Sequence, residues 1–126
     1  MSTAQVFGLF ESNPAHVDGM LTACVGDQIS LTCSHNNLYD GITVWTVSPP
    51  VSCMETIVHS SIRASQCGPF TFQDTTELTG DTTALLSTTA IATANVSMNG
   101  AVVECRDSTG RLFNQIGNTT LRIVGI

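Results

Sequence analysis

The amino-acid sequence predicts an all-β fold, a sandwich of two antiparallel sheets. Period-two alternation of apolar and polar residues, bounded by Gly, Asn, Asp and Pro, recurs along the chain without a sustained helical period. Only 11% of the residues are charged, so Thr, Ser, Asn and Gln must cover the surface, which suits strands. Cys33 and Cys105 lie 72 residues apart, and the only tryptophan, Trp45, lies between them. This spacing suits a disulfide between two sheets with an indole packed against it.

A half-buried strand is predicted at residues 26–34. Ile29, Leu31 and Cys33 alternate there with polar residues, so the three share one face. We expect this face to lie against the core.

The next strand is predicted at residues 42–47, after a turn rich in Asn, Asp and Gly. The proline pair at 49–50 ends it, because proline cannot donate a hydrogen bond to a sheet. Its inward residues are Thr43, Trp45 and Val47, and its outward residues are Val44 and Thr46.

Residues 51–74 are predicted to form hairpin strands held by a local disulfide. Further strands are predicted at residues 87–98 and 101–107, joined by an Asn99–Gly100 turn, and at residues 119–125. The residues expected to face inward on these later strands are Ala92, Ala94, Val96, Met98, Ala101, Val103, Cys105, Leu121 and Ile123.

The five cysteines do not have the paired C-x-x-C spacing of a zinc site. Disulfides are therefore the better interpretation, and they indicate an oxidising, extracellular setting. Two bridges and one free thiol have fifteen possible arrangements.

Several segments resemble strands of the immunoglobulin superfamily. Four segments correspond to named strands of that family. Strand B resembles GDQISLTC, strand C resembles TVWTV with its tryptophan, strand F resembles VVECRD and strand G resembles IGNTTLRIVG. The resemblance covers about residues 20–126. CGPFTF and NGAVVECR also resemble immunoglobulin-like modules in surface receptors of early-branching animals, such as sponge receptor tyrosine kinases. The resemblance implies an immunoglobulin-like sandwich, with any kinase domain elsewhere in the parent protein.

The interval from Cys33 to Cys105 also predicts a subtype. With one strand and turn every 8 to 12 residues or so, this interval has room for the two extra strands of the nine-stranded, variable-type layout. One family feature is missing, because Asn99, Ala101 and Val103 replace the aspartate, glycine and tyrosine that usually precede the second cysteine. Without this tyrosine corner, packing or the Asn99–Gly100 turn must fix the local geometry.

Among the fifteen arrangements we expect Cys33 to pair with Cys105 and Cys53 with Cys67. Cys24 is then the unpaired thiol. We expect it to be buried and inert, the alternatives being an intermolecular bridge or a different pairing.

The length of 126 residues fits one domain. We expect it at residues 19–126, with residues 1–18 an N-terminal segment partly introduced for expression. The chain has no run of 18 apolar residues, so we expect no membrane span within it. Its start lacks a signal peptide, which for an extracellular protein indicates a fragment cut from a longer precursor. We expect this fragment to be part of the ectodomain of a membrane protein.

Composition argues against several function classes. The net charge is −6, with four arginines and no lysine, which disfavours nucleic acid and anionic membranes as partners. The chain has no hydrolase, metalloprotease or nucleotide-binding motif, so we expect neither an enzyme nor a bound cofactor or metal. We interpret His16, His35 and His59 as surface residues, and Asp74, Glu77 and Asp81 as solvated loop carboxylates.

Two sequons, at Asn95 and Asn118, are candidates for N-glycosylation. Asn95 is expected on the outward side of its strand. A glycan on Asn118 would crowd one end of the sheet that contains the strands predicted at residues 42–47, 101–107 and 119–125.

Variable-type domains often associate through the outer face of this sheet. We expect two exposed valines to lie there beside opposite charges. The candidate interface residues are Val44, Thr46, Val102, Glu104, Arg106, Thr120 and Arg122.

The leading hypothesis is an extracellular module of a cell-surface receptor or adhesion protein. It would recognise a protein ligand or a second copy of itself, without catalysis and without touching the membrane directly. The alternative is a spacer domain in a larger ectodomain. A secreted enzyme is the third and weakest hypothesis.

Overall fold

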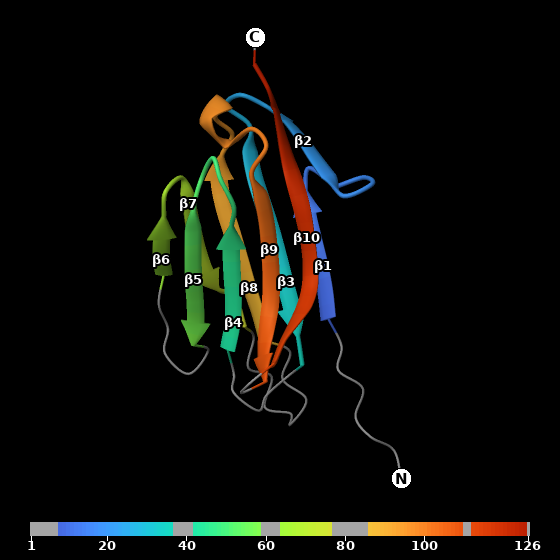
Figure 1. The fold of residues 1–126 in the computed structure, drawn as a ribbon, viewed down its shortest axis with the longest axis vertical. Coiled ribbons are helices and arrows are strands. Elements are labelled where there is room, and N and C mark those ends of the chain that lie inside the picture. The colour runs from blue at the N-terminus through green and yellow to red at the C-terminus, as the bar shows by residue number, and fades with distance from the viewer. Residues whose placement is uncertain (1–7, 37–41, 59–63, 77–85, 110–111, 126) are drawn as a thin grey trace.

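The computed structural model describes residues 8–36, 42–58, 64–76, 86–109 and 112–125. These residues form two packed sheets, and they confirm the all-β sandwich that the sequence predicts (Figure 1). The elements are β1 (Gly8–Asn13), β2 (Met20–Cys24), β3 (Gln28–His35), β4 (Ile42–Val47), β5 (Cys53–Val58), β6 (Ala64–Cys67), β7 (Phe70–Asp74), β8 (Leu86–Thr93), the 3₁₀ helix η1 (Val96–Met98), β9 (Val102–Thr109) and β10 (Leu112–Val124).

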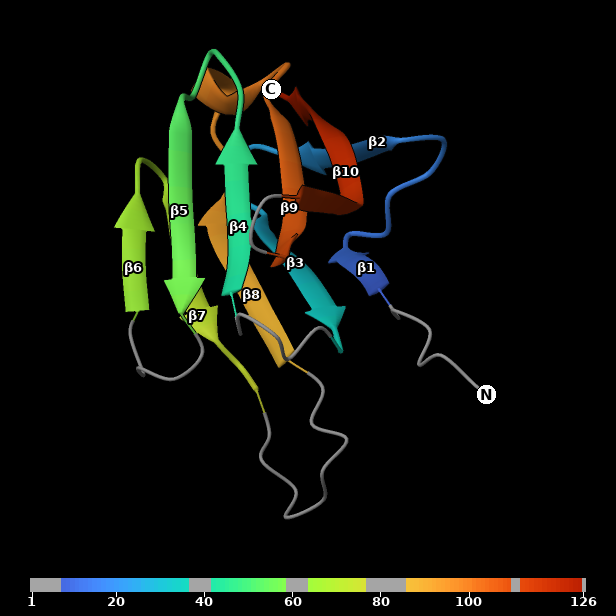
Figure 2. The ribbon, with the colours of Figure 1, turned by 60° about the horizontal axis from the view of Figure 1, so that its bottom comes forward.

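The first sheet has the strand order β1-β3-β8-β7-β6 and the second β2-β10-β9-β4-β5. Figure 2 shows β5 and β6, the end strands of the two sheets, side by side as in Figure 1. One feature differs from two wholly antiparallel sheets: β2 runs parallel to β10, so the second sheet is mixed. The chain leaves the first sheet after Asn13, and β2 then adds to the free edge of β10. The first two strands that the structure describes thus lie in different sheets.

The strand β1 belongs to the sandwich. It pairs with β3 from Gly8 opposite His35 to Asn13 opposite Ser30. The domain boundary expected at residue 19 is therefore too late. The sequence does not reveal this strand because its alternation is weak, with only Phe10 and Ser12 partly buried.

Phe10 also fixes β1 against the second sheet. The strand β10 has a bulge between Gln115 and Gly117. A Cβ atom at Gly117 would lie 2.4 Å from the Cβ of Phe10 and 2.5 Å from its Cγ. Position 117 therefore requires glycine for a close approach of β1 to β10.

The Cys33–Cys105 disulfide joins the two sheets through the core. Cys33 lies on β3 and Cys105 on β9, with their Cα atoms 6.4 Å apart. Trp45 is the β4 neighbour of Cys105 and is fully buried, with its ring centroid 5.6 Å from that of Phe72. The pairing and the packed indole match the sequence-based expectation.

The Cys53–Cys67 disulfide joins the sheets as well, at their edge. Cys53 lies on β5 and Cys67 on β6, which belong to different sheets, with their Cα atoms 5.9 Å apart. The expected local hairpin bridge is thus a bridge between sheets, because β5 pairs with β4 while β6 forms a hairpin with β7 through Gly68. Both disulfides therefore hold the two layers together.

The strand expected at residues 87–98 ends early. β8 stops at Thr93, and Asn95 caps η1 by accepting a hydrogen bond from the Ser97 N–H (3.0 Å). Met98 remains buried, but Val96, expected inward, is 61% exposed. The other inward residues predicted on the later strands are buried: Ala92, Ala94, Ala101, Val103, Cys105, Leu121 and Ile123.

Hydrogen bonds of the Asn99–Gly100 turn fix the local geometry before β9. Its Oδ1 accepts a hydrogen bond from the Ile123 N–H on β10 (2.9 Å), and the Gly100 N–H donates to the Leu121 carbonyl (2.8 Å). Gly100 has a φ of 90°, which favours glycine. The Asn99–Gly100 turn thus connects the end of η1 to the second sheet.

Candidate recognition face

The candidate interface residues all lie on the outer side of the second sheet, which we call the outer face. Their alternate neighbours on each strand, such as Trp45, Cys105 and Leu121, point into the core. The strand register brings residues of β4, β9 and β10 together across this face. Its members are Val44, Thr46, Val102, Glu104, Arg106, Thr120 and Arg122, and the neighbouring pairs are Val44–Arg106, Thr46–Glu104 and Val102–Thr120.

Glu104 and Arg106 form an ion pair on β9. The Nε of Arg106 donates to Oε1 of Glu104, two residues earlier on the same strand. The Arg106 side chain is 43% exposed and that of Glu104 17% exposed. An ion pair this open to solvent contributes little to stability. It does give the face one positive and one negative group side by side.

The apolar part of the outer face differs from the expectation. Val44 is buried, with 4% of its surface exposed, because it lies on an inner strand between Thr56 of β5 and Arg106 of β9. The expectation that it is an exposed interface valine is wrong. Met54, opposite Thr46 on β5, is instead 68% exposed. Strand alternation would have predicted that Met54 is exposed on the outer face, had the sequence shown that β5 belongs to this sheet.

Asn118 also lies on the outer face. It is exposed, and it is the β10 neighbour of Glu104. A group attached to Asn118 would therefore stand beside the ion pair. Asn95 is exposed too, but it caps η1 and does not lie on a strand.

Cys24 is a free, exposed thiol at the end of β2. The expectation of a buried thiol is wrong, since Leu21 and Ala23 take the inward positions of this strand. Its backbone N–H donates to Oδ2 of Asp27 (3.0 Å).

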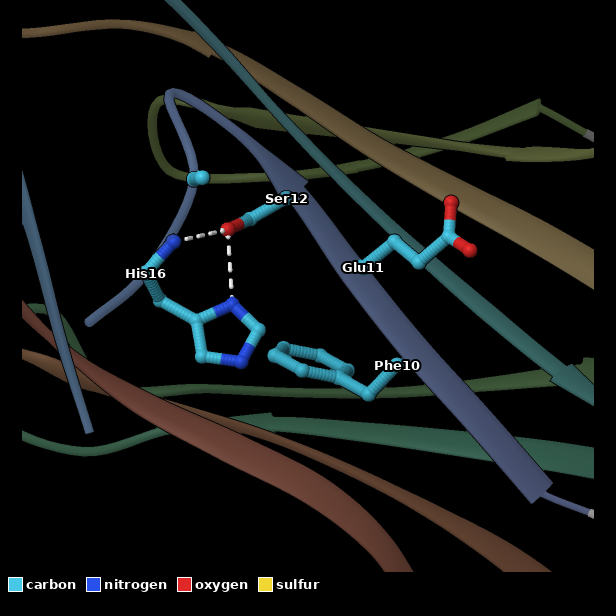
Figure 3. Close-up of a pocket in the computed structure, with 5 residues that line it drawn as sticks. Phe10, Glu11, Ser12 and His16 are labelled. Atoms are coloured by element: carbon cyan, nitrogen blue, oxygen red, sulfur yellow. Dashed lines mark hydrogen bonds between the residues drawn. The ribbon is translucent and has the colours of Figure 1, made fainter. Parts of the chain in front are cut away.

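An open pocket of about 270 Å³ is lined by Phe10, Glu11, Ser12, Ala15 and His16 (Figure 3). The Oγ of Ser12 lies 2.8 Å from Nδ1 of His16 and accepts the His16 backbone N–H at 2.9 Å. Glu11 points to the opposite side of β1, away from the imidazole (Figure 3). The contact ties the turn after β1 to the strand, and no carboxylate drawn in the pocket orients the imidazole as in a catalytic triad.

A buried polar layer lies next to the central disulfide. His35, Thr43 and Asp107 stand two residues away from Cys33, Trp45 and Cys105 on their strands, and all three are fully buried. Nε2 of His35 lies 2.8 Å from Oγ1 of Thr43, which is the register neighbour of Asp107. The expectation that His35 is a surface residue is therefore wrong, because inward alternation continues to the end of β3.

The buried carboxyl group of Asp107 is expected to lower the free energy of unfolding. Neither of its carboxylate oxygens has a hydrogen-bond partner among the described residues. We expect Asp107→Val to raise the free energy of unfolding by about 1–4 kcal/mol, because an apolar side chain replaces a buried acid that has no hydrogen-bond partner in the described part of the chain. Urea denaturation measures the change. The matched control, Glu11→Val at an exposed strand position, is expected to shift it by about 0.5 kcal/mol or less. A clear loss of stability in Asp107→Val would contradict this prediction.

Other candidate groups do not form a site among the described residues. There, no group of three His, Cys, Asp or Glu side chains is placed to hold a metal ion. Asp74 accepts the Thr76 backbone N–H (2.9 Å), while Glu77, Asp81 and His59 lie outside the described residues. No helix in the described part of the chain is long and apolar enough to cross a membrane.

No protein-family model matches this chain, and no curated protein matches its sequence.

Proposed function

We propose that this chain is an immunoglobulin-superfamily module of a cell-surface receptor or adhesion protein, and that it recognises a second copy of itself without catalysis. The two disulfides fit an oxidising extracellular setting. The strand layout fits a variable-type domain in β5, which extends the second sheet beyond β4, whereas β6 joins the first sheet instead. The observation that carries the proposal is the partly exposed Glu104–Arg106 pair on the outer face.

This pair makes the outer face complementary to itself. A two-fold axis near the pair would place Glu104 of one copy against Arg106 of the other, and the reverse contact follows by symmetry. The resulting contacts would be isologous, and a closed dimer would form without further growth.

The charge of the face favours such contact. The chain carries −6, so two copies repel each other in general. Among the described side chains of the outer face, however, the arginines at 106 and 122 outnumber the single acid at 104. Repulsion is therefore weakest where we place the contact. The exposed Met54 supplies apolar area next to it.

Reversing one charge tests the proposal. In glycan-free protein carrying Cys24→Ser, to prevent disulfide-linked artefacts, Arg106→Glu is expected to weaken self-association about tenfold, equivalent to 1.4 kcal/mol. Sedimentation at increasing concentration measures the dissociation constant. Glu11→Lys, an exposed charge reversal on the first sheet, is the control and is expected to have no comparable effect. A parent protein that stays monomeric at high micromolar concentration would favour the spacer function instead.

A further inference from the structure

We infer that an N-linked glycan on Asn118 covers the outer face and controls when two copies associate. The inference deepens the proposed function and rests on it. Asn118 is followed by Thr119 and Thr120, which complete the acceptor sequence. The structure places this sequon within the proposed contact surface.

The register of β9 and β10 gives the neighbours of the glycan. Asn118 is exposed and stands opposite Glu104, on a strand about 5 Å away. Thr46 of β4 is the next residue in the same row. A bulky, hydrated glycan leaving Asn118 would therefore stand over Glu104 and Thr46, where a second copy would have to pack.

The modification needs a glycan donor, a lipid-linked oligosaccharide diphosphate. A bond forms between the Asn118 Nδ2 and C1 of the first sugar, while the bond from C1 to the diphosphate oxygen breaks. The lipid diphosphate leaves with that electron pair, and the amide nitrogen loses one proton. Both the sequon and its exposure permit this reaction.

Asn95 supplies a matched internal control. It carries the second sequon and is exposed as well, but it caps η1, beyond the end of β8 in the first sheet. Ser97→Ala removes this sequon and leaves the Ser97 N–H that binds Asn95 in place. A glycan there would leave the outer face open.

The test uses protein secreted from a glycosylating host, in a Cys24→Ser background. Intact mass gives the occupancy of each sequon. A Thr46→Cys reporter on the outer face gives accessibility, through its rate of maleimide labelling. Sedimentation gives the dissociation constant of the same variants without the reporter.

We expect Asn118 to be occupied, and Asn118→Gln to speed labelling of Thr46→Cys at least fivefold and to tighten self-association at least tenfold. Ser97→Ala, which removes the other sequon, is expected to change neither. An unmodified Asn118, or a labelling rate that Asn118→Gln does not change, would overturn the inference. Faster labelling without self-association in any form would support shielding by the glycan and overturn the proposed self-recognition.

Discussion

Replacing both Cys33 and Cys105 by alanine is expected to lower the free energy of unfolding by about 4 kcal/mol. The disulfide closes a loop with a sequence separation of 72 residues and joins the two sheets beside the buried Trp45. Such a loss is a large share of the 5–15 kcal/mol typical of a domain. Urea denaturation followed by the fluorescence of Trp45 measures it.

The other cysteines provide graded controls. Replacing Cys53 and Cys67 together is expected to cost about 3 kcal/mol, because their separation is only 14 residues. Replacing the exposed Cys24 is expected to change stability by about 0.5 kcal/mol or less. A loss below about 1 kcal/mol for the central pair would contradict its role in holding the sheets together.

Gly117→Ala is expected to lower the free energy of unfolding by about 3 kcal/mol. The new Cβ would lie 2.4 Å from the Cβ of Phe10, and an atom so close to the backbone of β1 cannot move away without shifting the strand. Urea denaturation again measures the loss. Gly125→Ala is the control, since its Cβ would meet no atom closer than 3.5 Å.

A double-mutant cycle separates the Phe10 contact from other effects. Phe10→Gly removes all three atoms nearest to the new Cβ, although it costs stability by itself. In that background Gly117→Ala is expected to change stability by about 1 kcal/mol or less. An undiminished loss would mean that something other than the contact with Phe10 makes glycine necessary at position 117.

Much of the fold could be predicted from side-chain alternation and the cysteine–tryptophan spacing. These patterns are strong in β3, β4 and β9, where Cys33, Trp45 and Cys105 occupy the core. They fail in β1, whose burial depends on a close approach to Gly117 of a distant strand. They also fail at Val96, because this residue lies in a 3₁₀ helix, where side chains repeat every three residues and not every two.

The candidate site was predictable to a similar degree. Alternation alone places Glu104 and Arg106 on the outer face. It does not show that Val44 is covered, because that depends on the neighbouring strands β5 and β9. The position of Asn118 beside Glu104 depends on the β10 bulge, which shifts the register by one residue.

Charge exchange tests the central claim, that two copies meet through the Glu104–Arg106 pair, most directly. Glu104→Arg makes both charges of the pair positive, and Arg106→Glu makes both negative. In glycan-free protein carrying Cys24→Ser, we expect each variant alone to associate about tenfold more weakly than the parent. An equimolar mixture of the two is expected to form a heterodimer at least as tight as the parent homodimer, as measured by sedimentation. A mixture that associates no better than the separate variants would contradict the claim.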